Sequence, residues 1–274
     1  MNSRCCSLLK FLLTTKQNSI CNKVFFYDIA ESTQDIAISL AETNSKLNRT
    51  LIIANEQSGG KGRDGKIWIS PQGGIWLSLI IRPDISVNKA SFLSFVASLS
   101  VCEAIRAETG LESKIKWPND IVINSKKVSG ILISIGVEKA TLKYLIFGIG
   151  INSNLDNTSV QLISKTIGAA YEITSLRNEM SGSYIDCGNL IVRILQKLDY
   201  YLEQQEYDEL LVLNDWKVRC ETINKYVRIV KKDHTLYEGL VLDVDLDGSL
   251  IVKVANGNSV RVTDNQETIR TTTI

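Results

Sequence analysis

GGKGRDGKIW, residues 59–68, is the most informative stretch of this sequence, because glycines alternate with cations between two runs that are typical of β-strands. Glycine lets a backbone come close to a phosphate or a carboxylate, and Lys61, Arg63 and Lys66 would add charge-assisted donors. The stretch therefore predicts a loop that closes over an anion. The alternative is an exposed hairpin loop that its charges keep soluble. A P-loop is excluded, because no Gly-Lys-Ser/Thr opens a helix here.

The segments on either side of this loop alternate between strand and helix patterns. Ser32 and Asp35 have the spacing of a capping box, which predicts a helix start, and Gly110 supplies a helix stop. The run Gly74–Arg82 is apolar on both sides of its alternation, as a buried central strand would be. The predicted elements are strands over 23–27, 51–57 and Gly74–Arg82, a helix after Ser32 and a helix over Lys89–Thr109.

Farther along, the pattern changes character near residue 219. Before it we expect hairpin-like runs Ile115–Ile123 and Lys127–Val137, a strand over 145–152, and helices over Leu190–Gln205 and Tyr207–Val218. After Cys220, short strands are separated by turns such as Asp247-Gly248, which favours a small β-barrel of roughly fifty residues. The predicted organisation is an N-terminal extension (1–22), an α+β body with a mixed sheet (23–219) and an all-β module (220–274).

The composition limits the class of protein. Of 274 residues, 44% are hydrophobic and 22% charged, which is ordinary for a globular chain, and 31 basic residues balance 30 acidic ones. No overall field therefore favours nucleic acid or a membrane surface. Six cysteines without a CxxC pair predict reduced, cytoplasmic thiols. The single histidine, His234, excludes a histidine-based triad or metal cluster.

Two other motifs combine residues that folding alone does not require. Lys116-Trp117-Pro118-Asn119-Asp120 places a lysine among strand residues, where it either reaches inward to a phosphate or lies exposed before a turn. Gly148 and Gly150 fall on one strand face, which a ligand or another backbone could approach, and Asn152 follows with an amide suited to an adenine edge. Trp68 either stacks on a purine or packs in the core.

Taken together and in this order, the segments resemble the biotin protein ligase family over about residues 23–270. The resemblance rests on Glu31-Ser32-Thr33, Gln57, Gly59–Trp68, Lys116–Asp120, KVSGILI at Lys127–Ile133 and GIGIN at Gly148–Asn152. It implies a class II aminoacyl-tRNA synthetase-like catalytic domain with an SH3-like barrel behind it. It also implies that ATP and Mg²⁺ convert biotin to biotinyl-5′-AMP, from which a lysine of a biotin carboxyl carrier protein takes the biotin.

The resemblance also implies roles for single residues. Lys116 and Arg63 would be catalytic, and together with the ion they would stabilise the transition state as the biotin carboxylate attacks the α-phosphorus. Biotin would be held by Ser32, Thr33, Gln57, Gly60, Lys61, Gly62, Arg63, Lys116 and Gly130. ATP would be held by Arg63, Trp68, Lys116, Lys127, Asn152 and Arg270. Metal ligands are not assigned by it.

Several positions depart from the family pattern. Lys61 and Asp64 stand where arginines are common, Gln34 replaces a frequent asparagine, and Ser134 stands where an acidic residue is usual. The loop is less cationic as a result, which bears on how tightly it retains the intermediate. The region before the body is too short for a winged helix, so we expect a form without a DNA-binding domain and no nucleic-acid partner. A homodimer is expected from the resemblance alone, and no membrane association is expected.

Two rival functions follow from the same residues. A lipoate or octanoate protein ligase shares the fold and the adenylate chemistry, and KWPND favours biotin over it. A non-catalytic biotin-binding sensor would be expected to have lost Lys116 or Arg63, and both are present.

Overall fold

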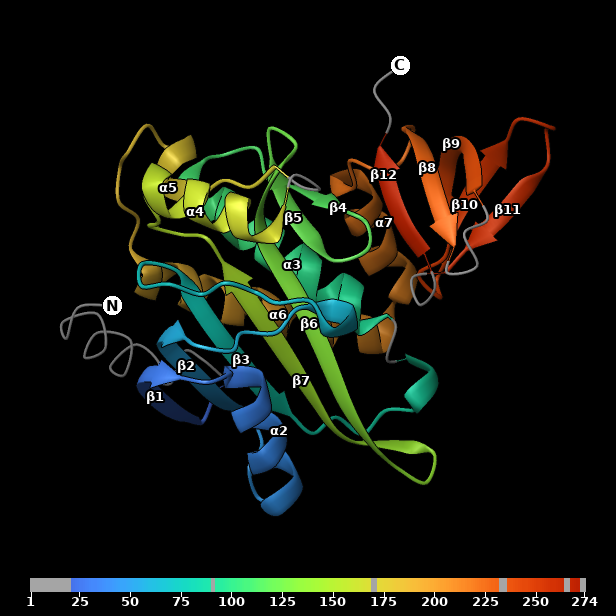
Figure 1. The fold of residues 1–274 in the computed structure, drawn as a ribbon. Helices are drawn as coiled ribbons and strands as arrows, with labels where there is room; N and C mark the ends of the chain where they lie inside the picture. Colours follow the sequence, from blue (N-terminus) through green and yellow to red (C-terminus); the bar gives the residue numbers. More distant parts are fainter. Residues whose placement is uncertain (1–20, 90–91, 169–171, 232–235, 264–266, 272–274) are drawn as a thin grey trace.

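The computed structural model describes residues 21–89, 92–168, 172–231, 236–263 and 267–271. Its main feature is a seven-stranded sheet with the order β1-β2-β3-β7-β6-β5-β4 (Figure 1). β1 and β2 are parallel and every other neighbouring pair is antiparallel, so the sheet is mixed as expected. The strands are β1 (Lys23–Ala30), β2 (Thr50–Gln57), β3 (Ile75–Ile81), β4 (Lys114–Lys116), β5 (Asp120–Ile123), β6 (Lys126–Glu138) and β7 (Thr141–Ile151).

Helices cover both faces of this sheet. α3 (Leu93–Thr109), α6 (Cys187–Tyr207) and α7 (Glu209–Arg219) share the main hydrophobic core with one face, and Figure 1 shows α3 and α6 crossing behind the strands. α2 (Thr33–Thr43) packs its alanines Ala37 and Ala41 against the other face, on a smaller core from β2, β3 and β7. The predicted Ser32 cap is confirmed, because Ser32 Oγ accepts from Asp35 N at 3.3 Å. Gly110 ends α3 in the left-handed conformation (φ 72°), also as predicted.

The central strand prediction is confirmed, since every residue of β3 is buried. The hairpin prediction for Ile115–Ile123 is corrected. The run is two strands, β4 and β5, which pair with each other, and only β5 pairs with β6. The chain reverses at Trp117–Asn119, where the Trp117–Pro118 peptide is cis and proline offers no N–H to a ladder.

Two helices between residues 152 and 187 were not predicted. α4 (Asn157–Ile167) is capped by Asp156, whose carboxylate accepts from Ser159 N at 2.9 Å, and α5 (Leu176–Glu179) is a short turn capped by Ser175. η1 (Arg63–Gly65) and η2 (Val87–Lys89) are short 3₁₀ turns.

The C-terminal module forms a second, antiparallel sheet with the order β11-β10-β9-β8-β12. Its strands are β8 (Tyr226–Lys231), β9 (Leu236–Val244), β10 (Leu250–Val254), β11 (Ser259–Val262) and β12 (Glu267–Thr271). Side chains such as Val227, Val241 and Leu250 belong to the same buried cluster as the helices of the body. The module is therefore packed onto the body, while its SH3-like character and the domain boundary at 219 stay predictions.

Two further properties of the described residues concern membrane-spanning helices and cysteine thiols. None of the helices in the described ranges is long and apolar enough to cross a membrane. Within the same ranges, Cys21, Cys102 and Cys220 carry free thiols, and burial raises the pKa of each to about 11. The expected extension 1–22 lies mostly outside the described residues.

Candidate active site

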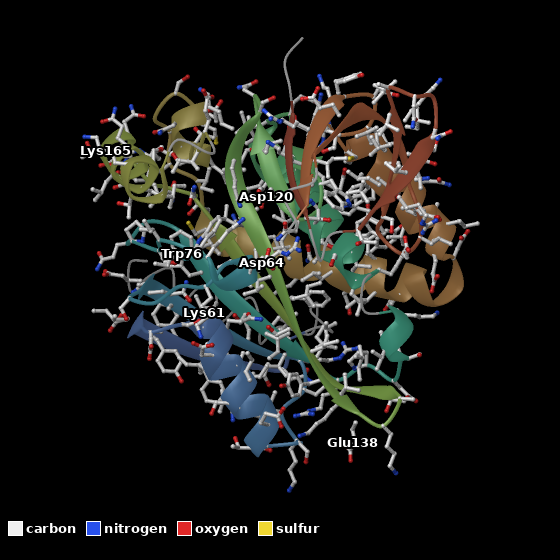
Figure 2. The ribbon with its side chains drawn as sticks, turned by 45° about the vertical axis from the view of Figure 1, so that its right-hand side comes forward. Lys61, Asp64, Trp76, Asp120, Glu138 and Lys165 are labelled. Carbon is white, nitrogen blue, oxygen red and sulfur yellow. The ribbon has the colours of Figure 1, made fainter. Side chains whose placement is uncertain are left out.

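A cavity of about 690 Å³ lies against one face of the sheet, within the range of small-molecule sites. Its walls come from the start of α2, the glycine-rich loop (residues 59–68), β3, β6, β7, α4 and the pentapeptide (Lys116–Asp120). Figure 2 shows Lys61, Asp64 and Asp120 toward the middle of the molecule, whereas Glu138 lies at the far tip of the β6–β7 hairpin. Segments that are distant in sequence therefore meet at one cavity.

Most of the predicted site residues line this cavity. They are Ser32, Thr33, Gln57, Lys61, Gly62, Arg63, Trp68, Lys116, Lys127, Gly130 and Asn152. Gly60 is not a lining residue, although a Cβ there would lie 2.3 Å from Trp68 O, so its lack of a side chain lets the loop pack on itself. Arg270 lies in β12 opposite Arg228, and its side chain is outside the described residues.

The glycines of β6 and β7 form one flat wall. Gly130 pairs with Gly150 and Leu132 pairs with Gly148 in the β6–β7 ladder. A Cβ would lie 2.8 Å from the Trp68 ring at Gly130 and 2.6 Å from Trp68 Nε1 at Gly150. The glycines therefore make room for the Trp68 ring, so a side chain approaches this face, where a ligand or another backbone was expected.

A buried chain of hydrogen bonds forms the polar end of the cavity. Thr33 N–H donates to Gln57 Oε1 at 2.7 Å, and Thr33 Oγ1 lies 3.0 Å from Ser78 Oγ. Ser78 Oγ donates to Gln34 Oε1 at 2.9 Å, and Gln34 Nε2 donates to Ser134 Oγ at 2.8 Å. The two departures at Gln34 and Ser134 are thus bonded to each other. A polar wall of this kind suits a ligand that both donates and accepts hydrogen bonds.

Ser78 was missed by sequence reasoning, although a serine inside an otherwise apolar strand was a signal for it. A Cβ at Gly148 would lie 2.3 Å from Gln34 Oε1, so this glycine also accommodates the polar chain. The apolar end of the cavity was missed as well. It consists of Ile163, Thr166, Ile167 and Ile173, and no local pattern in the sequence marked them.

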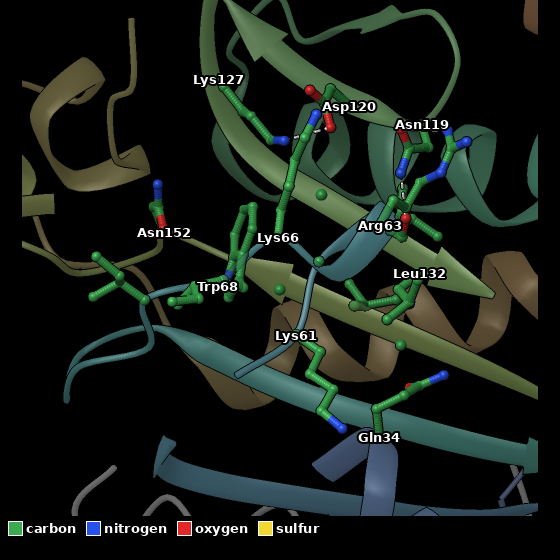
Figure 3. A pocket seen from close by; sticks show the side chains of 18 of the residues that line it. Gln34, Lys61, Arg63, Lys66, Trp68, Asn119, Asp120, Lys127, Leu132 and Asn152 are labelled. Carbon is green, nitrogen blue, oxygen red and sulfur yellow. Dashed lines mark hydrogen bonds and ion pairs between the residues drawn. The ribbon is translucent and has the colours of Figure 1, made fainter. Parts of the chain in front are cut away.

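The middle of the glycine-rich loop, residues 61–64, makes exposed or partly buried contacts. Lys61 Nζ lies 2.7 Å from Asp35 Oδ2 of α2, and both side chains are more than a third exposed. Arg63 Nη1 donates to Asn119 Oδ1 at 3.3 Å, which joins the loop to the pentapeptide (Figure 3). Asp64 has a left-handed backbone (φ 54°), which aspartate tolerates better than most side chains. The departure at Asp64 is therefore compatible with the turn that the loop makes.

The contacts that hold the pentapeptide are mostly buried. Asn119 Nδ2 donates to Ile131 O, and Ile131 N–H donates back to Asn119 O at 3.1 Å. Asp120 pairs with Lys127 of β6 at 2.6 Å, and both side chains are mostly buried. Lys127 Nζ also lies 5.1 Å from the centre of the Trp68 ring, within cation–π range. Lys116 and Lys127 line the cavity together with the loop cations Lys61, Arg63 and Lys66.

Trp68 and Asn152 stand toward the α4 end of the cavity (Figure 3). Trp68 packs edge-on to the buried Trp76, with ring centroids 6.4 Å apart, and its Nε1 is buried without a hydrogen-bond partner among the described residues. An unpaired buried N–H is costly, and here it results from packing the indole against Gly150. Asn152 uses its amide to donate to Thr174 O at 3.0 Å, which fixes the side chain in place.

Comparisons with known proteins identify the family. The family model described as "Biotin/lipoate A/B protein ligase family" matches residues 26–152. The "Bifunctional ligase/repressor BirA" of Bacillus spizizenii is 34% identical over 236 residues, which cover 85% of this chain and 70% of that protein. The "Biotin--[acetyl-CoA-carboxylase] ligase" of Mycobacterium tuberculosis is 25% identical over 237 residues, which cover 81% and 80% of the two chains.

Solved structures show the same fold. The biotin protein ligase of Aquifex aeolicus in complex with biotin and ATP superposes with a TM-score of 0.76 at 25% identity, covering 92% of this chain and 100% of that one. The identity to the Bacillus protein and its coverage suffice to assign the family without the structural likeness. The chain belongs to the biotin protein ligase family.

Proposed function

We propose that this ligase activates biotin with ATP to biotinyl-5′-AMP and pyrophosphate, and then transfers the biotin to a lysine of a biotin carboxyl carrier protein. One observation carries the proposal. One cavity is lined by a polar, hydrogen-bonded wall, by five cations and by a tryptophan beside the isoleucines of α4. A ureido ring, a carboxylate next to a phosphate, and a purine require these three environments.

The polar end would receive the ureido ring. Ser32, Thr33 and Gln57 line it with hydroxyl and amide groups, and Gly130 leaves space beside them. Because the Ser78–Gln34–Ser134 chain fixes these groups behind the wall, little side-chain entropy remains to be lost on binding. Gly60, Lys61 and Gly62 would fold over the valerate chain as part of the loop.

The middle of the cavity would carry the first chemical step. A carboxylate oxygen of biotin attacks the α-phosphorus of ATP, a P–O bond forms, and the bond to pyrophosphate breaks. Two anions approach each other in this step, so fixed cations lower its barrier more than a nucleophile would. Lys116 and Arg63 supply those cations from two different segments, and Lys127 adds a third near the nucleotide.

The α4 end would receive the nucleotide. Trp68, Lys127 and Asn152 line it, and Arg270 of β12 would approach from the C-terminal module. Mg²⁺ usually takes one or two carboxylates together with substrate phosphates, and Asp64 and Asp120 are cavity carboxylates that fit this need. When bound, the ion would neutralise phosphate charge.

The second step needs the loop. The carrier lysine's amine attacks the acyl carbon of the mixed anhydride, a C–N bond forms, and AMP leaves with the bonding pair. Water would hydrolyse the anhydride first if it had access, and a closed glycine-rich loop excludes it. The loop's exposed contacts allow it to open for the carrier. We further propose a cytoplasmic location, which the reduced thiols of Cys21, Cys102 and Cys220 support, and a homodimer.

The test is direct. The purified protein is incubated with ATP and Mg²⁺ and with either biotin or lipoate, and acyl-AMP is followed by mass spectrometry before and after addition of a carrier domain. We expect biotinyl-AMP, then one biotin per carrier lysine. Lipoyl-AMP in place of biotinyl-AMP would support the rival ligase, and stable biotin binding without any acyl-AMP would support a sensor.

A further inference from the structure

The tryptophan of the pentapeptide is bonded to the C-terminal module. Trp117 directly follows Lys116 at the end of β4. Its indole Nε1 donates to Gly248 O at 2.8 Å, and its backbone N–H donates to Thr222 Oγ1 at 3.0 Å. Trp117 and Thr222 are only 5% and 1% exposed, so water cannot readily replace either bond.

Both acceptors are themselves fixed. Gly248 stands in the β9–β10 turn with φ +88°, a conformation that glycine adopts without strain. Its N–H donates to Asp245 O at 2.9 Å, and Arg261 pairs with both Asp245 and Asp247 across the turn. The carbonyl that receives the indole is therefore held by a closed turn.

Thr222 follows an isolated β-bridge to β4. Cys220 bridges Ile115 in parallel fashion, and Glu221 N–H donates to Ile115 O at 2.9 Å. β4 has only three residues and stands at the edge of the sheet, with β5 on its other side. Residues 220–222 thus supply the second neighbour that an edge strand lacks, directly beside Lys116.

We infer that Thr222 and the Gly248 turn form a positioning element for Lys116. They hold Trp117 from two directions and so fix the backbone from which the Lys116 side chain enters the cavity. The inference rests on the proposed function, in which Lys116 lies between the two substrate anions. A misplacement of about 1 Å in a catalytic group can cost about 10²-fold in rate, so such support affects the chemical step. Thr222 is a positioning residue, since it does not line the cavity.

Thr222→Val tests this with little change in shape, and Thr222→Ser keeps the hydroxyl that accepts the Trp117 N–H. Thr50→Val is the matched control, because Thr50 is also 1% exposed, bonds only to nearby Asn48 O at 3.2 Å and does not line the cavity. For each full-length variant, kcat and the biotin KM of biotinyl-AMP formation are measured, along with the thermal midpoint.

We expect Thr222→Val to lower kcat about tenfold with the biotin KM within about twofold of wild type, and Thr222→Ser to restore most of kcat. Thr50→Val should lower the thermal midpoint comparably but leave kcat unchanged. The inference is overturned if Thr222→Val keeps the wild-type kcat, if Thr50→Val loses as much, or if serine does not rescue.

Trp117→Phe gives an independent arm should Thr222→Val not fold, because phenylalanine keeps an aromatic ring but loses the N–H to Gly248 O together with part of the buried indole volume, so its kcat is compared with its thermal midpoint. A fall in kcat supports the element, and an unchanged kcat in this variant refutes the indole's part in it. The positioning element and the proposed function can be refuted separately. Wild-type protein that makes biotinyl-AMP alongside an unimpaired Thr222→Val refutes the positioning element alone, whereas wild-type protein that makes none refutes the proposed function.

Discussion

The glycine-rich loop and the pentapeptide both bring cations into one cavity, but they are held in opposite ways. The loop's cations contact their surroundings through the exposed Lys61–Asp35 pair and a 3.3 Å hydrogen bond from Arg63 to Asn119, whereas its ends are held by Gly59 N–H to Glu31 O and by the packing of Trp68 on Trp76. The pentapeptide is joined to β6 on one side and to the C-terminal module on the other by buried or mostly buried contacts. Exposed ion pairs contribute little, whereas buried bonds persist until the structure unfolds.

This difference assigns different tasks to the two segments. Lys116 must be in place before the substrates meet, which suits the more firmly held pentapeptide. Arg63 must move aside when the carrier lysine enters, which suits the glycine-rich loop. Variants that weaken one segment or the other test this difference. They follow in order of decreasing expected effect.

Lys116→Ala should have the largest effect. Removing a preorganised charge from the transition state lowers kcat by about 10²–10³-fold. The measurement is pyrophosphate release with biotin and ATP. Lys114→Ala is the control, because Lys114 is the exposed lysine at the other end of β4. Equal losses in both variants would mean that Lys116 acts through general charge and not through its place in the cavity.

Arg63→Gly should chiefly affect retention of the intermediate. A hydrogen bond to a charged group contributes about 1.5–3 kcal/mol, so biotinyl-AMP should escape roughly ten- to a hundredfold faster and label bystander lysines. Rapid filtration gives the release rate, and biotin on added albumin reports stray labelling. The release rate of Arg63→Lys, which keeps the charge, should lie between those of wild type and Arg63→Gly. Unchanged carrier selectivity in Arg63→Gly would contradict the loop's shielding task.

High pH should lower the free energy of unfolding through Cys102, which packs against the segment that leads into the pentapeptide. Cys102 of α3 is buried against Ser113, just before β4, and burial raises its pKa from the ordinary 9.0 to about 11. Above pH 9 the thiol ionises in the unfolded chain but stays protonated in the fold. The free energy of unfolding should therefore be unaffected below pH 9 and fall as pH rises toward 11, by up to about 1.4 kcal/mol per pH unit for this thiol.

Urea unfolding at pH 8, 9, 10 and 11 measures this slope for wild type and Cys102→Ala. The alanine variant is less stable throughout because of its cavity, but its slope above pH 9 should be smaller by one thiol's share. Identical slopes in the two proteins would show that Cys102 ionises as readily in the folded protein as in the unfolded chain.

Asp35→Asn should have the smallest effect. It removes the exposed Lys61–Asp35 pair, which is expected to contribute about 0.2–1 kcal/mol, so the biotin KM should change less than about fivefold. The change should vanish at high KCl, because salt screens exposed pairs. Glu42→Gln, which breaks the pair with Lys143 at the other end of α2, is the control and should leave KM unaltered. A large, salt-independent change would mean that the loop is as firmly held as the pentapeptide.

Much of this site could be predicted from the sequence, since its cations and glycines occur in short, dense motifs. The loop, the pentapeptide and the glycines of β7 all line the cavity as expected. Gly60 does not line it, and of the hairpin-like run expected over Ile115–Ile123 only β5 pairs with β6, because the chain reverses at Pro118. A proline at a turn and a proline at a strand edge leave the same local pattern, so only pairing partners could distinguish them.

The sequence by itself determined which side chains are available and the period of each element, because amphipathic spacing and capping are local properties of the chain. Only the tertiary structure decided which of them meet. Gln34 donates a hydrogen bond to Ser134, which is 100 residues away in the sequence. The Trp117 indole donates one to Gly248 O, which is 131 residues away. No local rule connects such positions, since their approach depends on how the sheet twists and where the C-terminal module packs.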